Sequence, residues 1–111
     1  MDFEVNIVEH AESYSLVSVR GEIDLHSAPK VQNAVERGAN GVEAVVVDMR
    51  GITFMDSTAL SMFMRAKDDL QQRGISLRLA DPSEAVERLF GVTGFGEYFE
   101  VFSSKEAAIA D

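Results

Sequence analysis

The sequence predicts an α/β protein: one domain over residues 1–111, built on a mixed, mainly parallel β-sheet with about four helices packed on it. Three observations support this fold class. The length of 111 residues is that of a single domain. Apolar residues alternate with a period of two in some segments and recur at helical spacing in others. After two initial strands, helices and strands alternate, an order that implies parallel pairing through crossover helices.

The first part of the chain predicts a hairpin followed by a helix. Residues 3–9 (FEVNIVE) alternate apolar and polar side chains, which is typical of a half-buried strand. Residues 14–23 (YSLVSVRGEI) read as a second strand, and the short polar connection between the two favours antiparallel pairing. The helix is expected to have Ser27 as its cap and Pro29 in its first turn, and to end near Gly38.

The middle of the chain predicts a buried strand and the longest helix. Residues 43–49 (EAVVVDM) are apolar on both faces, which suits a central strand covered on both sides. A turn around Gly51 is expected to follow. Residues 54–74 then contain a helix that Gly74 closes. The apolar face of this helix consists of Ala59, Phe63, Ala66 and Leu70.

The last third predicts two more strands and two more helices. Residues 75–80 (ISLRLA) alternate like a strand, and residues 98–102 (YFEVF) form the final one. Between them we expect a helix with Asp81 as its cap and Pro82 at its first helical position. Ser103 is the expected cap of a short C-terminal helix.

The composition excludes several classes of function. The chain contains no cysteine, so it has no disulfides, thiolate metal sites or thiol nucleophiles. Its net charge is −9, with ten scattered basic residues against 19 acidic ones, which argues against nucleic-acid binding. No apolar run approaches the ~20 residues of a membrane span, and the acidic opening does not resemble a signal peptide. We therefore expect a soluble, cytoplasmic protein.

The motifs of common enzymes are also missing. Neither the phosphate-binding G-x-x-x-x-G-K-[ST] loop nor the G-x-S-x-G nucleophile elbow occurs. His10 and His26 stand singly in polar segments and are expected to be solvated. Asp24 and His26 offer two metal ligands, and nothing near them in the sequence completes a set. The sequence predicts a protein with no catalytic residues, no metal and no cofactor.

One segment is a candidate functional site. In VVVDMRGITFMDSTALSMFM, a buried strand leads into a helix that opens with Asp56, Ser57 and Thr58. These residue types cap helices, although capping needs only one of them. A hydroxyl in the first turn is also where an added phosphate would face exposed N–H groups and the positive end of the helix dipole. Spacing alone leaves both readings open. For Met55 the alternatives are core packing and an adaptable contact with a partner.

The segment VVVDMRGITFMDSTAL resembles the signature of the anti-sigma factor antagonist family, the STAS domain. In that signature an apolar strand, a turn and an Asp-Ser pair open a helix. GEIDLHSAP is similar to the family's Gly-Glu-Leu-Asp segment, and SEAVERLFGVTGF is similar to its penultimate helix and following turn. The resemblance runs from about Gly21 to Phe95 and implies a single STAS domain over residues 1–111.

The resemblance implies a regulatory binding protein. Such proteins bind an anti-sigma factor, often itself a Ser/Thr protein kinase, and thereby free a sigma factor. The kinase would phosphorylate Ser57, with Thr58 as the competing acceptor, and a phosphatase would restore the free hydroxyl. Asp24 and Asp56 match family positions, so the implied partner-binding set also contains these two residues and Met55.

Two further expectations follow. Ala59 stands where many members have glycine, a departure that bears on the fit of the partner. Asp24 and Ser57 both follow strands that pair in parallel, so they are expected to lie close together at one edge of the sheet. The alternative to the phosphorylation switch is a STAS scaffold or transport-accessory domain that is never phosphorylated.

Overall fold

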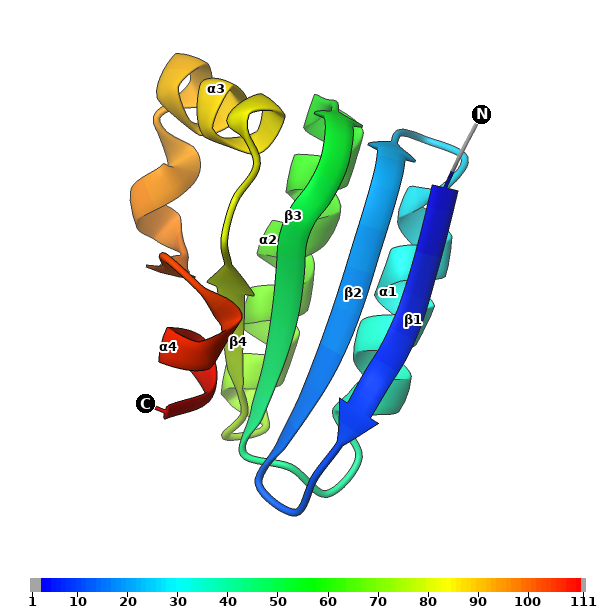
Figure 1. Ribbon diagram of the computed structural model, residues 1–111, viewed down its shortest axis with the longest axis vertical. Coiled ribbons are helices and arrows are strands. Elements are labelled where there is room, and N and C mark those ends of the chain that lie inside the picture. Colours follow the sequence, from blue (N-terminus) through cyan, green and yellow to red (C-terminus); the bar gives the residue numbers. More distant parts are fainter. Residues whose placement is uncertain (1–2, 111) are drawn as a thin grey trace.

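The computed structural model describes residues 3–110 and confirms the predicted order of elements (Figure 1). The strands are β1 (Phe3–His10), β2 (Tyr14–Ile23), β3 (Ala44–Met55), β4 (Ser76–Ala80) and β5 (Glu100–Phe102). The helices are α1 (Ala28–Gly38), α2 (Ser57–Gln72), α3 (Glu84–Thr93) and α4 (Lys105–Ala110), with a 3₁₀ turn, η1, at Phe95–Tyr98. The five strands follow the order β1-β2-β3-β4-β5; β1 and β2 form the antiparallel hairpin, and the other pairs are parallel.

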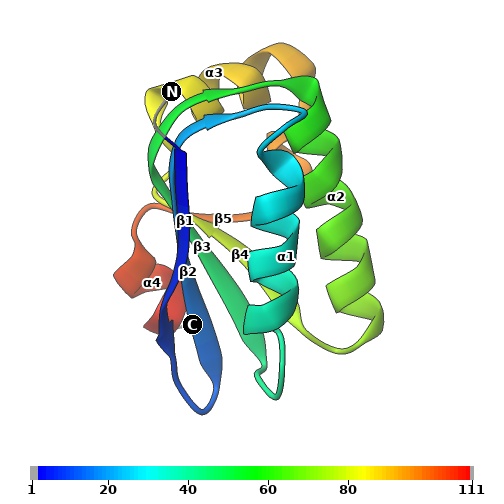
Figure 2. The same cartoon turned by 90° about the vertical axis from the view of Figure 1, so that its right-hand side faces the viewer.

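The helices cover the sheet unequally. Figure 2 shows α1 and α2 side by side on one face, α4 on the other face and α3 across one end. The main core lies beneath α1 and α2, and its fully buried side chains include Val17, Val19, Val45, Val47, Phe63 and Leu70. A smaller cluster beneath α4 consists of Leu16, Val46, Ala80 and Ala108. Because successive valines of β3 contribute to both clusters, β3 is the central strand that its two-sided apolar pattern predicts.

The predicted turn at Gly51 is wrong, because β3 continues through this residue to Met55. Ser18 of β2 lies opposite Asp48 whereas Arg20 lies opposite Gly51, so β3 carries one extra residue between the two pairs. A Cβ atom on Gly51 would lie 2.7 Å from Cγ of Arg20. Glycine is therefore needed here because a neighbouring side chain crosses closely over the strand.

The starts of two helices also differ from the prediction. Asp81 has a φ of +52°, the left-handed conformation, and does not cap α3. A cap residue normally has extended backbone, which Ser83 has and the left-handed Asp81 does not, so the cap falls after the proline. Ser83 takes this role: its hydroxyl accepts a hydrogen bond at 3.3 Å from the third helical N–H. At α4, the hydroxyl of Ser104 rather than that of Ser103 accepts the capping hydrogen bond.

Candidate functional site

The turns that follow β2 and β3 lie beside each other at one end of the sheet. Ile23 and Met55, the last residues of the two strands, are opposite each other in the parallel register. The backbone N–H of Asp56 donates a hydrogen bond to the carbonyl of Ile23 at 3.2 Å. Asp24 follows Ile23 and Ser57 follows Asp56, so the prediction that Asp24 and Ser57 share one edge of the sheet is confirmed.

Asp56 caps α2. Its backbone is extended, and its Oδ1 accepts a hydrogen bond from the N–H of Ala59 at 3.0 Å. Its carbonyl accepts the first intrahelical hydrogen bond, from the N–H of Leu60 at 3.1 Å. Since one side-chain cap is sufficient for a helix start, the structure does not require the hydroxyls of Ser57 or Thr58 for this purpose.

The two candidate hydroxyls differ in accessibility. Ser57 is exposed at the first position of α2, whereas Thr58 is half-buried. A group at this position lies within the first turn of a 16-residue helix, where the unpaired N–H groups carry partial positive charge. Of the two residues, Ser57 is the one that a modifying enzyme can reach more easily.

The turn after β2 is held by interlocking hydrogen bonds. Oδ1 of Asp24 accepts from the backbone N–H groups of His26 and Ser27, at 2.9 and 3.2 Å. The hydroxyl of Ser27 accepts from the N–H of Asp24 and donates to the carbonyl of Glu22, both at 2.9 Å. Ser27 is the N-cap residue of α1, as predicted, but its side chain makes no capping hydrogen bond to the helix. The backbone N–H groups of Ser27 and then His26 lower the pKa of Asp24 because they stabilise its carboxylate.

Acidic side chains therefore flank the candidate hydroxyl. Asp24 and Asp56 are both half-buried and belong to the two adjacent turns, with Ser57 directly after the second. The positive end of the α2 helix dipole partly offsets the negative charge of these two carboxylates. Any additional negative charge on Ser57 enters a region that already holds two carboxylates, in a chain of net charge −9.

The apolar surface near this site differs from the prediction. The side chain of Met55 is only 4% exposed and packs in the main core, which favours core packing of the two alternatives, although Met55 also lines a hollow at the end of β3. Leu25 and Phe54 are exposed instead, at 65% and 49%. Sequence reasoning missed both, although an apolar residue within the polar DLH turn was a signal for Leu25.

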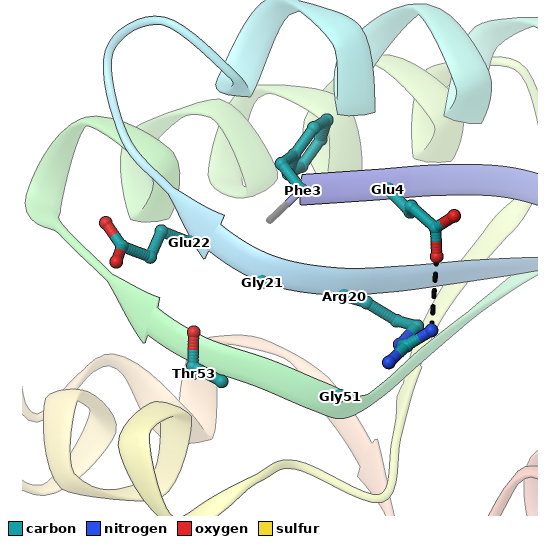
Figure 3. Close-up of a pocket in the computed structure, with 7 residues that line it drawn as sticks. All are labelled: Phe3, Glu4, Arg20, Gly21, Glu22, Gly51 and Thr53. Atoms are coloured by element: carbon teal, nitrogen blue, oxygen red, sulfur yellow. Dashed lines mark hydrogen bonds and ion pairs between the residues drawn. The ribbon is translucent and has the colours of Figure 1, made fainter. Parts of the chain in front are cut away.

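A hollow of about 600 Å³ lies on the open face of β1, β2 and β3. Figure 3 shows it crossed by the ion pair between Arg20 and Glu4, at 3.1 Å, with Glu22 and Thr53 along its side. Arg20 and Glu4 are both largely exposed. The remaining lining residues are Phe3, Gly21 and Gly51. A positive charge already paired with a carboxylate, in an open groove that lacks a nucleophile beside a base, provides no catalytic constellation.

The histidines stand apart from each other. Nε2 of His10 lies 3.2 Å from the carbonyl oxygen of Asn40, at the end of β1 rather than in the predicted connection. Within residues 3–110, no group of three or more His, Asp or Glu side chains is placed to hold a metal ion. In the same described segment, no helix is both long and apolar enough to cross a membrane.

The site can be compared with known proteins. The sequence profile of the STAS domain family matches residues 4–108. The anti-sigma-B factor antagonist of Listeria monocytogenes is 34% identical over 103 residues, which cover 91% of this chain and 90% of that protein. The crystal structure of an anti-sigma factor antagonist from Mycobacterium paratuberculosis superimposes with a TM-score of 0.83 at 24% identity, covering 98% of this chain and 92% of that one. The phosphorylated form of the Bacillus cell fate determinant SpoIIAA superimposes with a TM-score of 0.69 at 18% identity, covering 98% of each chain.

Proposed function

Because the chain belongs to the STAS domain family, we propose that it acts as an anti-sigma factor antagonist. In this role it is a regulatory binding protein rather than an enzyme. It binds an anti-sigma factor, and the sigma factor that this partner held becomes available for transcription in the cytoplasm. We propose further that the partner is a Ser/Thr protein kinase that phosphorylates Ser57, and that a phosphatase reverses the modification.

The observation that carries this proposal is the exposure of Ser57 on a helix that Asp56 already caps. A phosphate on Ser57 adds roughly −1.5 to −2 charges at neutral pH. The helix N-terminus favours an exposed negative group by ~0.3–1 kcal/mol, so the fold tolerates the modification. The structure of SpoIIAA in its phosphorylated form, which has this fold, supports modification within it.

The same phosphate acts against a partner. A surface packed closely on this loop would have to accommodate the new charge beside Asp24 and Asp56, and two carboxylates already make the region unfavourable for more negative charge. Couplings of this kind are typically ~1–3 kcal/mol, which corresponds to a several-fold to hundredfold loss of affinity. Binding is therefore strong in the free form and weak in the phosphorylated form.

The test uses the anti-sigma factor that the wild-type protein captures from native cytosol, identified and then purified. Ser57→Ala should bind it and resist ATP-dependent release, whereas Ser57→Asp should bind weakly. Thr58→Ala is the control for the acceptor and should, like wild type, still release the partner on addition of ATP. After incubation with the partner and ATP, mass spectrometry should place phosphate on Ser57. Phosphate on Thr58 alone, or equal affinity of the Ala and Asp variants, would show that the switch is wrong and would favour the unphosphorylated scaffold.

A further inference from the structure

Helix α3 carries a second apolar stripe besides the one that faces the core. The inward stripe contains the fully buried Val86 and also Phe90, which stacks on Phe99 with ring centroids 5.8 Å apart. Ala85, Leu89 and Val92 recur at i, i+4 and i+7, so they lie along one neighbouring face of the helix. Val92 is 81% exposed. Ala85 and Leu89 are half-buried, and Leu89 also packs against the main core, so it is Val92 that the packing of the core does not explain.

The outward stripe meets the end of β3. Phe54 lies with Ala85, Leu89 and Val92 around a hollow of about 260 Å³, and Arg88 contributes to its lining. We call these five residues the α3 patch. An aromatic side chain and a valine, both exposed around one small hollow, form a surface suited to a single apolar side chain.

The α3 patch belongs to the same end of the molecule as the proposed switch. Phe54 precedes Ser57 by three residues, and α3 packs on β3. Figure 1 shows α3, the start of α2 and the turn between β2 and α1 in a row along this end. A protein that covers Ser57 from this end therefore has the α3 patch within reach.

The charge on the α3 patch indicates the chemistry of its occupant. Arg88 is 72% exposed and lies 3.8 Å from Glu84, a distance typical of a weak surface pair. A partner carboxylate can therefore engage its guanidinium group. A second copy of this chain is less suited, since each copy has a net charge of −9 and each α3 also carries Glu84 and Glu87.

We propose that the α3 patch is a second anchor for the anti-sigma factor, which inserts an apolar side chain between Phe54 and Val92 and places a carboxylate beside Arg88. This inference rests on the proposed function and adds a contact that does not depend on phosphate. The switch at Ser57 and the anchor on α3 contribute separately to affinity. Substitutions in the two places should therefore reduce affinity by factors that multiply.

The experiment measures the affinity of the purified anti-sigma factor for six proteins: wild type, Val92→Asp, Arg88→Glu, Val8→Asp, Ser57→Asp and the double variant Ser57→Asp/Val92→Asp. Val92→Asp places a charge in the patch and should weaken binding by at least about tenfold, as expected for an interface hot spot. Arg88→Glu should weaken it several-fold, and this loss should shrink as salt is raised. Val8→Asp is the matched control: Val8 is 55% exposed on β1, away from the patch, and its substitution should leave affinity unchanged. Thermal unfolding verifies that every variant is folded.

The outcomes separate the two proposals. If wild type binds the anti-sigma factor and Val92→Asp binds it equally well, the anchor is refuted while the proposed function stands. If wild type binds no anti-sigma factor, both are refuted. Light scattering of the free protein should show a monomer; a dimer that Val92→Asp dissociates would assign the α3 patch to a second copy and would overturn the anchor. Multiplicative losses in Ser57→Asp/Val92→Asp would support it.

Discussion

Replacement of Asp56 by alanine tests the capping geometry at the site. The substitution removes the Oδ1 that accepts from the N–H of Ala59 at 3.0 Å. Loss of such a cap costs typically ~1 kcal/mol, and loss of the charge at the helix N-terminus costs a further ~0.3–1 kcal/mol. For a chain of 111 residues, an unfolding entropy of ~2.1 cal/mol/K per residue converts this into a fall in Tm of about 6–9 °C. Asp56→Asn keeps the acceptor and loses only the charge, so its Tm should fall by about 1–4 °C.

Thermal unfolding followed by circular dichroism measures both variants against wild type. Glu12→Ala is the control, because Glu12 is an exposed acid in the hairpin turn, outside any helix. Its Tm should change by less than about 2 °C, as for most surface substitutions. An alanine variant as stable as wild type, or an asparagine variant as unstable as the alanine one, would refute the argument that Asp56 acts through this hydrogen bond.

Three other predictions concern the buried core, the β-bulge that the extra residue makes in β3 at Gly51, and the loss of stability at low pH. Phe63→Ala leaves a cavity at a fully buried position and should lower the free energy of unfolding by ~3–5 kcal/mol in urea; a loss below ~1 kcal/mol would contradict this. Gly51→Ala should cost ~1–3 kcal/mol by overpacking, and less in an Arg20→Ala background, because the new Cβ meets Cγ of Arg20; equal costs would contradict it. The backbone N–H of Ser27 lowers the pKa of Asp24 in the folded protein. The ionised carboxylate of Asp24 therefore stabilises the fold at any pH above the pKa that Asp24 has in the unfolded chain. This stabilisation is lost as the pH falls through the lower pKa of the folded protein. On acidification below about pH 4, the free energy of unfolding of Asp24→Asn should therefore fall by less than that of wild type. Parallel dependence of the two free energies on pH would contradict this role of Asp24.

The order of elements could be predicted because the patterns that set it are local. β2 begins and ends at the predicted residues, Tyr14 and Ile23, since its alternation is uninterrupted and a polar turn bounds it on each side. The edge shared by Asp24 and Ser57 followed from topology alone, because the carboxyl ends of neighbouring parallel strands lie together. Caps were less predictable. Asp81 and Ser83 are both good capping residues, and the choice between them depends on the backbone: Asp81 is left-handed and donates its N–H to the carbonyl of Phe102, whereas Ser83 is extended.

The second half of β3 could not be recognised as a strand. Its core-facing residues are Val45, Val47, Met49, Ile52 and Met55, so a spacing of two becomes three on two occasions. Each longer step coincides with a shift of register against β2. A pattern that breaks twice, with Gly51 at the first break, reads locally as a turn. The contact that explains Gly51 within the strand is with a residue distant in sequence, because the aliphatic part of the Arg20 side chain crosses over Gly51. No local sequence pattern contains this contact.

The same irregularity determines which side chains reach the proposed binding surface. A regular strand would place one outward residue between two inward ones, but between Ile52 and Met55 there are two, Thr53 and Phe54, and both are exposed. The extra residue leaves Phe54 facing α3 while Met55 still enters the core. Bulges re-aim side chains in this way beside functional sites. The bulged end of β3 thus presents an apolar residue to the α3 patch and, two residues later, delivers Asp56 to cap the helix that exposes Ser57.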